Sequence, residues 1–212
     1  MSLKSSAKGG GGFDPVPAGT HGAYCIAVID LGKQHTEYKG QAKIQPKVIL
    51  AFETPDETVR IEDDDKPMII RQEYTNNLGD KANLRHHLVS WRGKEFTDDE
   101  LAEFDLSKLP GVPCMISVVH QTSKTSGNVY GKITGISKLP KNMALPPMFN
   151  KPLIYDVADG RNAVFESLGE FTQKKIEQCD EWQHPDGASE SDPVSQASDE
   201  IDGEEPEDNI PF

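Results

Sequence analysis

The sequence predicts a mainly β domain with helical additions, followed by an acidic tail. Five short stretches alternate apolar and polar residues as strands do. Helical spacing appears after the third stretch and again after the fifth. Residues 184–212 hold ten of the 35 acidic residues and no Lys or Arg. We therefore expect a flexible leader (1–12), a folded domain (13–160), a C-terminal helix (161–183) and a disordered acidic tail (184–212).

Strands are expected wherever β-branched and aromatic residues alternate with polar ones. The predicted ranges are 21–31, 42–53, 68–74, 113–121 and 128–139. Between the second and third strands, residues 55–67 are rich in Asp and Glu and are expected to form an acidic loop.

A first helix is expected over residues 81–91, between the third and fourth strands. Asp80 can cap its start, and Gly93 can end it. One face carries an apolar stripe made of Leu84, Leu88 and Trp91.

A second short helix is expected from the capping-box pattern Thr97-Asp-Asp-Glu100 through Phe104. A five-stranded Greek-key barrel of the OB type carries its helix between the third and fourth strands. The order of elements therefore predicts an OB-fold barrel with a helical insert at that point. Other small β-barrels fit the same five strands.

Net charge and cysteine content say more about the surroundings in which the protein works than about its function. The net charge of −13 comes mostly from the tail, so the body is nearly neutral and can still carry a local basic groove. Cys25, Cys114 and Cys179 are odd in number and widely spaced, which argues against a disulfide framework or a cysteine zinc site. Cys25 and Cys114 lie in apolar runs and are expected in the core. With no apolar signal segment or membrane span, we expect a cytoplasmic protein.

One candidate DNA-binding surface is the polar face of the second and fifth predicted strands. Lysines on strands can contact phosphates, and a neighbouring aromatic ring can stack on a base. The candidates are Lys43, Lys47, Tyr130, Lys132 and Lys138. The alternative is a solvated strand face, which is the commoner role of alternating lysines.

Two further groups of basic and aromatic residues are candidates for DNA contact. The first surrounds the predicted helix and contains Arg85, Arg92 and Lys94, with Trp91 expected in the core. The second is the connection between the first two strands, with Tyr38 for stacking and Lys39 for phosphate.

No catalytic, cofactor or metal motif is apparent. The sequence lacks a P-loop, a GxSxG elbow and an HExxH pair. The adjacent His86 and His87 point about 100° apart on a helix and do not suit one metal ion. We therefore expect a non-enzymatic protein without cofactor or metal.

The tail ends in Asp208-Asn209-Ile210-Pro211-Phe212 after an acidic run. Asp208, Ile210, Pro211 and Phe212 are predicted to bind a partner, with Phe212 in an apolar pocket. A compatible alternative is that the acidic tail imitates DNA and occupies the basic groove of its own body.

This ending resembles the tail of bacterial and phage single-stranded DNA-binding proteins. The body is similar to phage-encoded replication proteins in two runs, PVPAGTHGAYCIAVIDLG (15–32) and LRHHLVSWRGKEFTDDEL (84–101). The resemblance implies sequence-independent binding of single-stranded DNA in phage replication, recombination and repair, with possible homo-oligomers. It also implies recruitment of a polymerase, helicase, primase or nuclease through the tail. Two alternatives remain: an adaptor that docks a replication enzyme without binding DNA, and a strand-annealing recombination protein.

Overall fold

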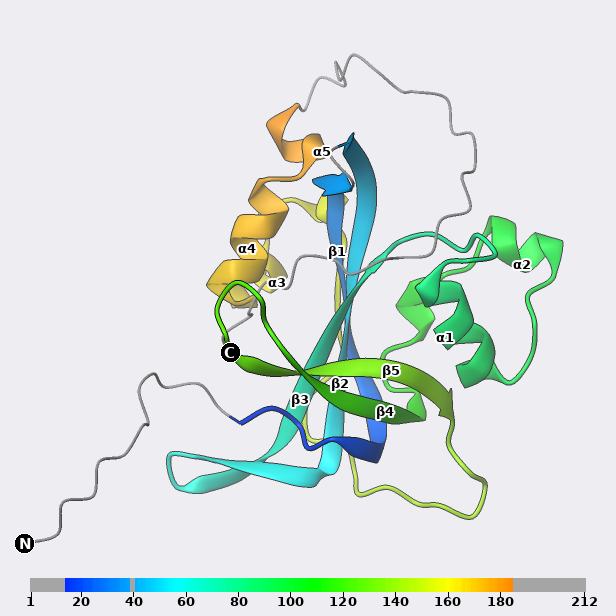
Figure 1. The fold of residues 1–212 in the computed structure, drawn as a ribbon, viewed down its shortest axis with the longest axis vertical. Helices are drawn as coiled ribbons and strands as arrows, with labels where there is room; N and C mark the ends of the chain where they lie inside the picture. The colour runs from blue at the N-terminus through cyan, green and yellow to red at the C-terminus, as the bar shows by residue number, and fades with distance from the viewer. Residues whose placement is uncertain (1–13, 39–40, 185–212) are drawn as a thin grey trace, which may run out of the picture.

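One six-stranded sheet organises the computed structural model, which describes residues 14–38 and 41–184 (Figure 1). The strand order is β3-β2-β1-β4-β5, with antiparallel neighbours, and β6 pairs in parallel with β1. The strands are β1 (Gly19–Tyr38), β2 (Gln41–Ile61), β3 (Asp64–Thr75), β4 (Pro113–Thr122), β5 (Val129–Lys138) and β6 (Leu153–Tyr155).

Helices follow β3 and β6, and this confirms the mainly β fold with helices in the two predicted places. Between β3 and β4 lie α1 (Asn83–Arg92), α2 (Asp98–Ala102) and the short η1 (Leu106–Lys108). After β6 come η2 (Val157–Asp159), α3 (Ala163–Ser167), α4 (Glu170–Glu177) and α5 (Asp180–Gln183). Figure 1 shows α1 and α2 on one side of the sheet and α3–α5 on the other. No helix in the described ranges is long and apolar enough to cross a membrane.

Strand β2 contributes to two separate cores, one on each face of the sheet. Its even-numbered residues Val48, Leu50 and Phe52 pack with α1, β4 and β5 in the first core. The odd-numbered Ile49 and Ala51 pack with the C-terminal segment in the second core. The predicted core cysteines Cys25 and Cys114 lie in the first core, and burial raises the pKa of the Cys25 thiol to about 12.

The edge strands β3 and β5 do not pair through backbone hydrogen bonds, but a side-chain hydrogen bond joins them. The Gln72 side-chain oxygen accepts a hydrogen bond from the backbone N–H of Ile133 at 3.3 Å. Gly131 permits this approach, because a Cβ there would lie 3.2 Å from Cδ1 of Ile70. A larger residue there would require the Ile70 side chain to shift by a few tenths of an ångström.

The predicted acidic loop over 55–67 is wrong. β2 continues to Ile61 and β3 starts at Asp64, so only Glu62 and Asp63 form the turn. Arg60 faces Asp65 across the two strands, with Nη1 3.7 Å from Oδ1. The dense charges suggested a loop, whereas they lie on an exposed two-stranded ribbon where opposite charges pair.

The helix termini are correct in part. Asp80 does not cap α1: the N-cap is Ala82, and the Asp80 carboxylate instead accepts a hydrogen bond from Arg85 at 2.5 Å. Gly93 ends α1 in the left-handed conformation, at φ 71°, and the capping box at Thr97 is present, as predicted.

The single helix predicted over 161–183 is instead three short helices. The backbone is extended at Leu168 (ψ 151°) and at Cys179 (ψ 153°). These breaks allow Phe165, Ile176 and Cys179 to enter the second core together. A continuous helix would place them on a single straight stripe instead.

Glu53 is a fully buried carboxylate that fixes the chain after β5 to the sheet. Its oxygens accept hydrogen bonds from the backbone N–H groups of Phe149 (2.7 Å) and Asn150 (2.9 Å), and from the Asn150 side-chain amide (2.6 Å). Hydrogen bonds to a charged acceptor are among the stronger ones in proteins.

We therefore expect Glu53→Ala to lower the free energy of unfolding by about 3 kcal/mol, because it leaves these donors without an acceptor. Urea denaturation followed by circular dichroism measures this. The control Glu95→Ala removes an exposed carboxylate and is expected to change stability by less than about 0.5 kcal/mol. Equal effects of the two substitutions would contradict this role of Glu53.

Candidate nucleic-acid interface

Two cations lie on the outer surface where β3 approaches β5. Ile70 and Ile133 point into the first core, and Gln72 reaches the Ile133 backbone. Strand alternation therefore directs Arg71 of β3 and Lys132 of β5 outward, on the same side of the two strands. These two cations, on strands joined by the Gln72–Ile133 hydrogen bond, are here called the seam site.

Arg71 is a charged group that has no counter-charge among residues 14–38 and 41–184. Its side chain is half-buried, and burial lowers the pKa of the guanidinium, which still stays protonated at biological pH. Its Nε is buried and has no hydrogen-bond acceptor. Among the described residues, no carboxylate lies within ion-pair distance of Arg71 or Lys132. Such an unsatisfied group suits an external anion, and the arginine fork matches the geometry of phosphate.

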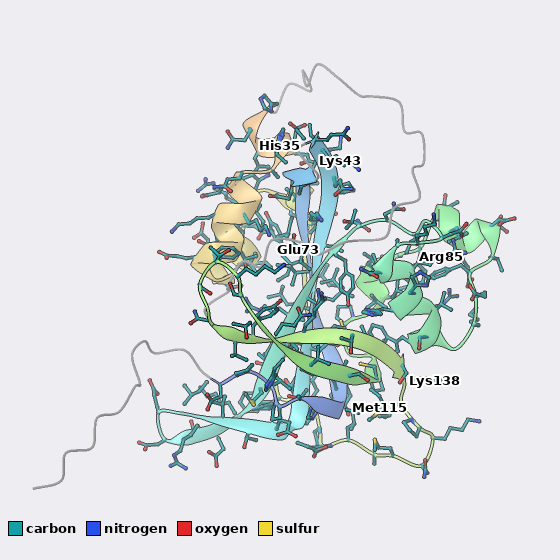
Figure 2. All side chains as sticks on the ribbon, viewed as in Figure 1. His35, Lys43, Glu73, Arg85, Met115 and Lys138 are labelled. Atoms are coloured by element: carbon teal, nitrogen blue, oxygen red, sulfur yellow. The ribbon has the colours of Figure 1, made fainter. Side chains whose placement is uncertain are left out.

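The nearest acid on the same face of β3 is already neutralised. Glu73 lies two residues from Arg71, and its carboxylate is 2.6 Å from Nζ of Lys175 on α4. Figure 2 shows Glu73 beside this helix. Glu73 therefore does not neutralise Arg71.

Two aromatic rings lie on this side of the sheet. Tyr130, two residues from Lys132 on β5, donates a hydrogen bond to the Gln121 side-chain oxygen at 2.7 Å, which fixes its half-exposed ring. Phe149 is 62% exposed, and its backbone is fixed to Glu53. Glu53 and Arg71 are diagonal neighbours on the outer face of β2 and β3, since Ala51 pairs with Arg71 and Glu53 with Ile69.

The residues predicted to share one face of β5 lie on two different faces. Lys132 and Tyr130 share the outer face of β5, but a register shift between Ser117 and Val118 of β4 places Lys138 on the same side as the buried Ile136. Lys138 reaches solvent only because β5 ends there. The expectation that it shares a face with Lys132 is wrong.

The two predicted lysines of β2 differ in environment. Lys47 is only 3% exposed, and its ammonium group donates to the Thr75 hydroxyl at 3.0 Å, so it is a buried residue of the sheet. Lys43 is half-buried near the end of the β1–β2 hairpin. Figure 2 shows Lys43 far from Arg85 and Lys138, so the predicted residues do not form one surface.

The predicted basic cluster around α1 is occupied by internal contacts. Arg85 donates to Asp80 and to the Leu78 carbonyl oxygen. Arg92 and Lys94 both bind the carboxylate of Glu100, and the hydrogen bond from Lys94 is the main reason that the pKa of Glu100 falls to about 2. A DNA-contact role for these three cations stays a prediction, and it would require exchange of these contacts. Trp91 is buried, as predicted, and donates to the Pro113 carbonyl oxygen at 3.0 Å.

The remaining predicted residues lie outside the described part of the chain. They are the Tyr38 side chain, Lys39, Asp208, Ile210, Pro211 and Phe212, together with the leader and residues 185–212. Within the described residues, no group of three or more His, Cys, Asp or Glu side chains is arranged to hold a metal ion.

Sequence reasoning missed Arg71 and Phe149. Arg71 sits in the strand run IIRQEY, where alternation alone could have placed it on the outer face. Its missing counter-charge depends on tertiary structure. Phe149 follows two prolines in a segment without periodicity, and no sequence signal indicates its exposure.

Comparison with protein-family models finds no match, and no curated protein matches this chain.

Replacing Arg71 is expected to cost no stability, since its burial is not offset by an ion pair. We expect Arg71→Met to leave the free energy of unfolding unchanged or to raise it by about 1 kcal/mol in urea denaturation. The control Arg85→Met removes a guanidinium that has two acceptors, and a loss of about 1 kcal/mol is expected. A clear loss in Arg71→Met would show that the guanidinium has a partner within the folded chain.

Proposed function

We propose that this protein binds single-stranded DNA without reading its sequence and without catalysis. The observation that carries the proposal is the unpaired, half-buried Arg71 beside Lys132 on the outer face of the sheet. Phosphates would bind these cations, and bases would stack on Tyr130 and Phe149. Cations for the phosphates and aromatic rings for the bases are how single strands are held independently of sequence.

The strand arrangement supports an OB-type barrel as the scaffold of this site. Such a barrel has a helix between its third and fourth strands, where α1 and α2 lie. The Gln72–Ile133 hydrogen bond brings β3 to β5, the two strands that would close the barrel. In OB-folds the outer face of the second and third strands is the nucleic-acid face, and Arg71 lies on it.

The acidic tail gives the proposal its second part, recruitment of replication or recombination enzymes. The sequence resemblance to single-stranded DNA-binding proteins supports this role for Asp208, Ile210, Pro211 and Phe212. The alternative is an adaptor that uses the tail and binds no DNA. The seam site favours the first function, because an adaptor has no need of an unpaired buried cation.

Titration of a fluorescent oligo(dT) at several salt concentrations tests the DNA-binding proposal. We expect micromolar or tighter binding at low salt that weakens steeply as salt rises. Arg71→Met and Lys132→Met are each expected to reduce the slope of log affinity against log salt by about 0.7, the value of one phosphate contact on a single strand. Phe149→Ala is expected to weaken binding about fivefold or more through lost stacking.

The matched control is Lys108→Met, which removes an exposed cation that pairs with Asp105 on η1. It is expected to leave the slope unchanged. Absence of binding at low salt, with the tail removed, would overturn the proposal and leave the adaptor.

Deletion of residues 184–212 separates the two parts of the function. We expect DNA affinity to stay the same or rise, because ten negative charges are removed, while binding to a purified polymerase, helicase, primase or nuclease is lost. Affinity for oligo(dT) and co-purification with each enzyme are measured on the same preparations. A large fall in DNA affinity would show that the tail takes part in DNA binding.

A further inference from the structure

An apolar pocket of about 450 Å³ lies on the α1 side of the sheet. It is formed by the end of α1, by the chain entering β4 and by the chain leaving β5. Its lining includes Trp91, Leu109, Val112, Pro113, Leu139 and Met143. Val112 is 38% exposed and Met143 43% exposed, so part of this apolar lining faces solvent. The volume lies in the range of sites for small ligands or a few side chains.

Two lysines border the pocket. Lys138 and Lys141 line it, and in the described part of the chain neither has a carboxylate within ion-pair distance. Arg92 also lines the pocket, but its charge is paired with Glu100. Figure 2 shows Lys138 well separated from Glu73, which marks the seam-site face. The pocket therefore suits an apolar peptide that carries negative charge beside its apolar residues.

The tail of this chain has that composition. Ile210, Pro211 and Phe212 are preceded by Glu204, Glu205, Glu207 and Asp208. Pro211 restricts the conformations that this segment would lose on docking, which favours binding.

The length of the tail allows it to reach the pocket of its own body. The last described residue is His184, and 25 residues lie between it and Ile210. That length spans up to about 90 Å when extended. A folded domain of this size has a radius of gyration of about 15 Å. Tethering also raises the effective concentration of the segment to about the millimolar range.

We infer that the segment Ile210–Phe212 docks in this pocket of its own chain, with its acidic run against Lys138 and Lys141. Docking hides the tip from other proteins until a partner displaces it. The site is separate from the seam site, and the inference does not rest on DNA binding.

Fluorine NMR of the full chain labelled with 5-fluorotryptophan tests this, because Trp91 lines the pocket and Trp182 belongs to the second core. The double variant Ile210→Ala/Phe212→Ser is expected to shift the Trp91 resonance and leave Trp182 unchanged. The control Val194→Ala/Ile201→Ala alters apolar residues elsewhere in the tail and is expected to shift neither.

A synthetic peptide of residues 203–212 provides the second measurement. Added to the Ile210→Ala/Phe212→Ser chain, it is expected to restore the wild-type Trp91 resonance, while the same peptide with Ser for Phe212 does not. Lys138→Ser/Lys141→Ser in that chain is expected to weaken peptide binding about fivefold.

Three results would overturn the inference. The first is an identical Trp91 resonance in the wild type and in the Ile210→Ala/Phe212→Ser chain. The second is peptide binding that is insensitive to the lysine substitutions. The third is a wild-type Trp91 shift that depends on protein concentration, because this would assign the pocket to the tail of a second copy.

Discussion

Burial of β2 on both faces is the constraint on which the rest of the structure depends. Every residue from Lys47 to Thr54 is buried, so neither face of this strand can remain open to water. One face requires α1 with β4 and β5, and the other requires the chain from β6 to α5. The C-terminal helices are therefore part of the same folded unit as the sheet. The carboxylate of Glu53, buried at one end of this stretch, adds a polar attachment for the same returning chain.

The same constraint determines which surface stays open. The second core covers the outer face over β1 and β2, and its packing partners come from the C-terminal segment. At this cover, β3 carries the half-buried Arg71 between Ile69, which packs against the second core, and Glu73, which binds Lys175 of α4. A desolvated cation without a partner lowers stability, and a double-sided core is stable enough to retain it. A site selected for binding an anion would contain such an unsatisfied group, because the group gains its partner only when the anion binds.

Local patterns predicted the fold better than they predicted the site. Alternation located β4 and β5, and Gly93 and the capping box at Thr97 marked helix ends, because these signals depend on a few neighbouring residues. The length of the β2–β3 ribbon was not predicted, because dense charges hid its strand pattern. β6 was not predicted, because its pairing with β1 depends on residues distant in the sequence. Lys47 resembled a surface lysine, and only the cover on both faces of β2 makes it a buried one. Arg71 became a candidate only when its lack of an internal partner was visible.

The body has two positively charged sites that could attract the acidic tail: the seam site and the pocket bordered by Lys138 and Lys141. Charge alone cannot decide which of the two the tail would bind. Attraction between the tail and the seam site, or between the tail and Lys138 and Lys141, falls with salt in the same way. The apolar lining around Trp91 and Met143 differs in kind, because it can bury the side chains of Ile210 and Phe212 while the seam site offers mainly cations and exposed rings. In the inferred docking, electrostatic attraction would set how fast the tail reaches the body, and apolar burial would set where it stays. A DNA strand carries phosphates but no apolar tip, so on the proposed function it would occupy the seam site. If both proposals hold, this difference in chemistry would let DNA and tail occupy one body at the same time.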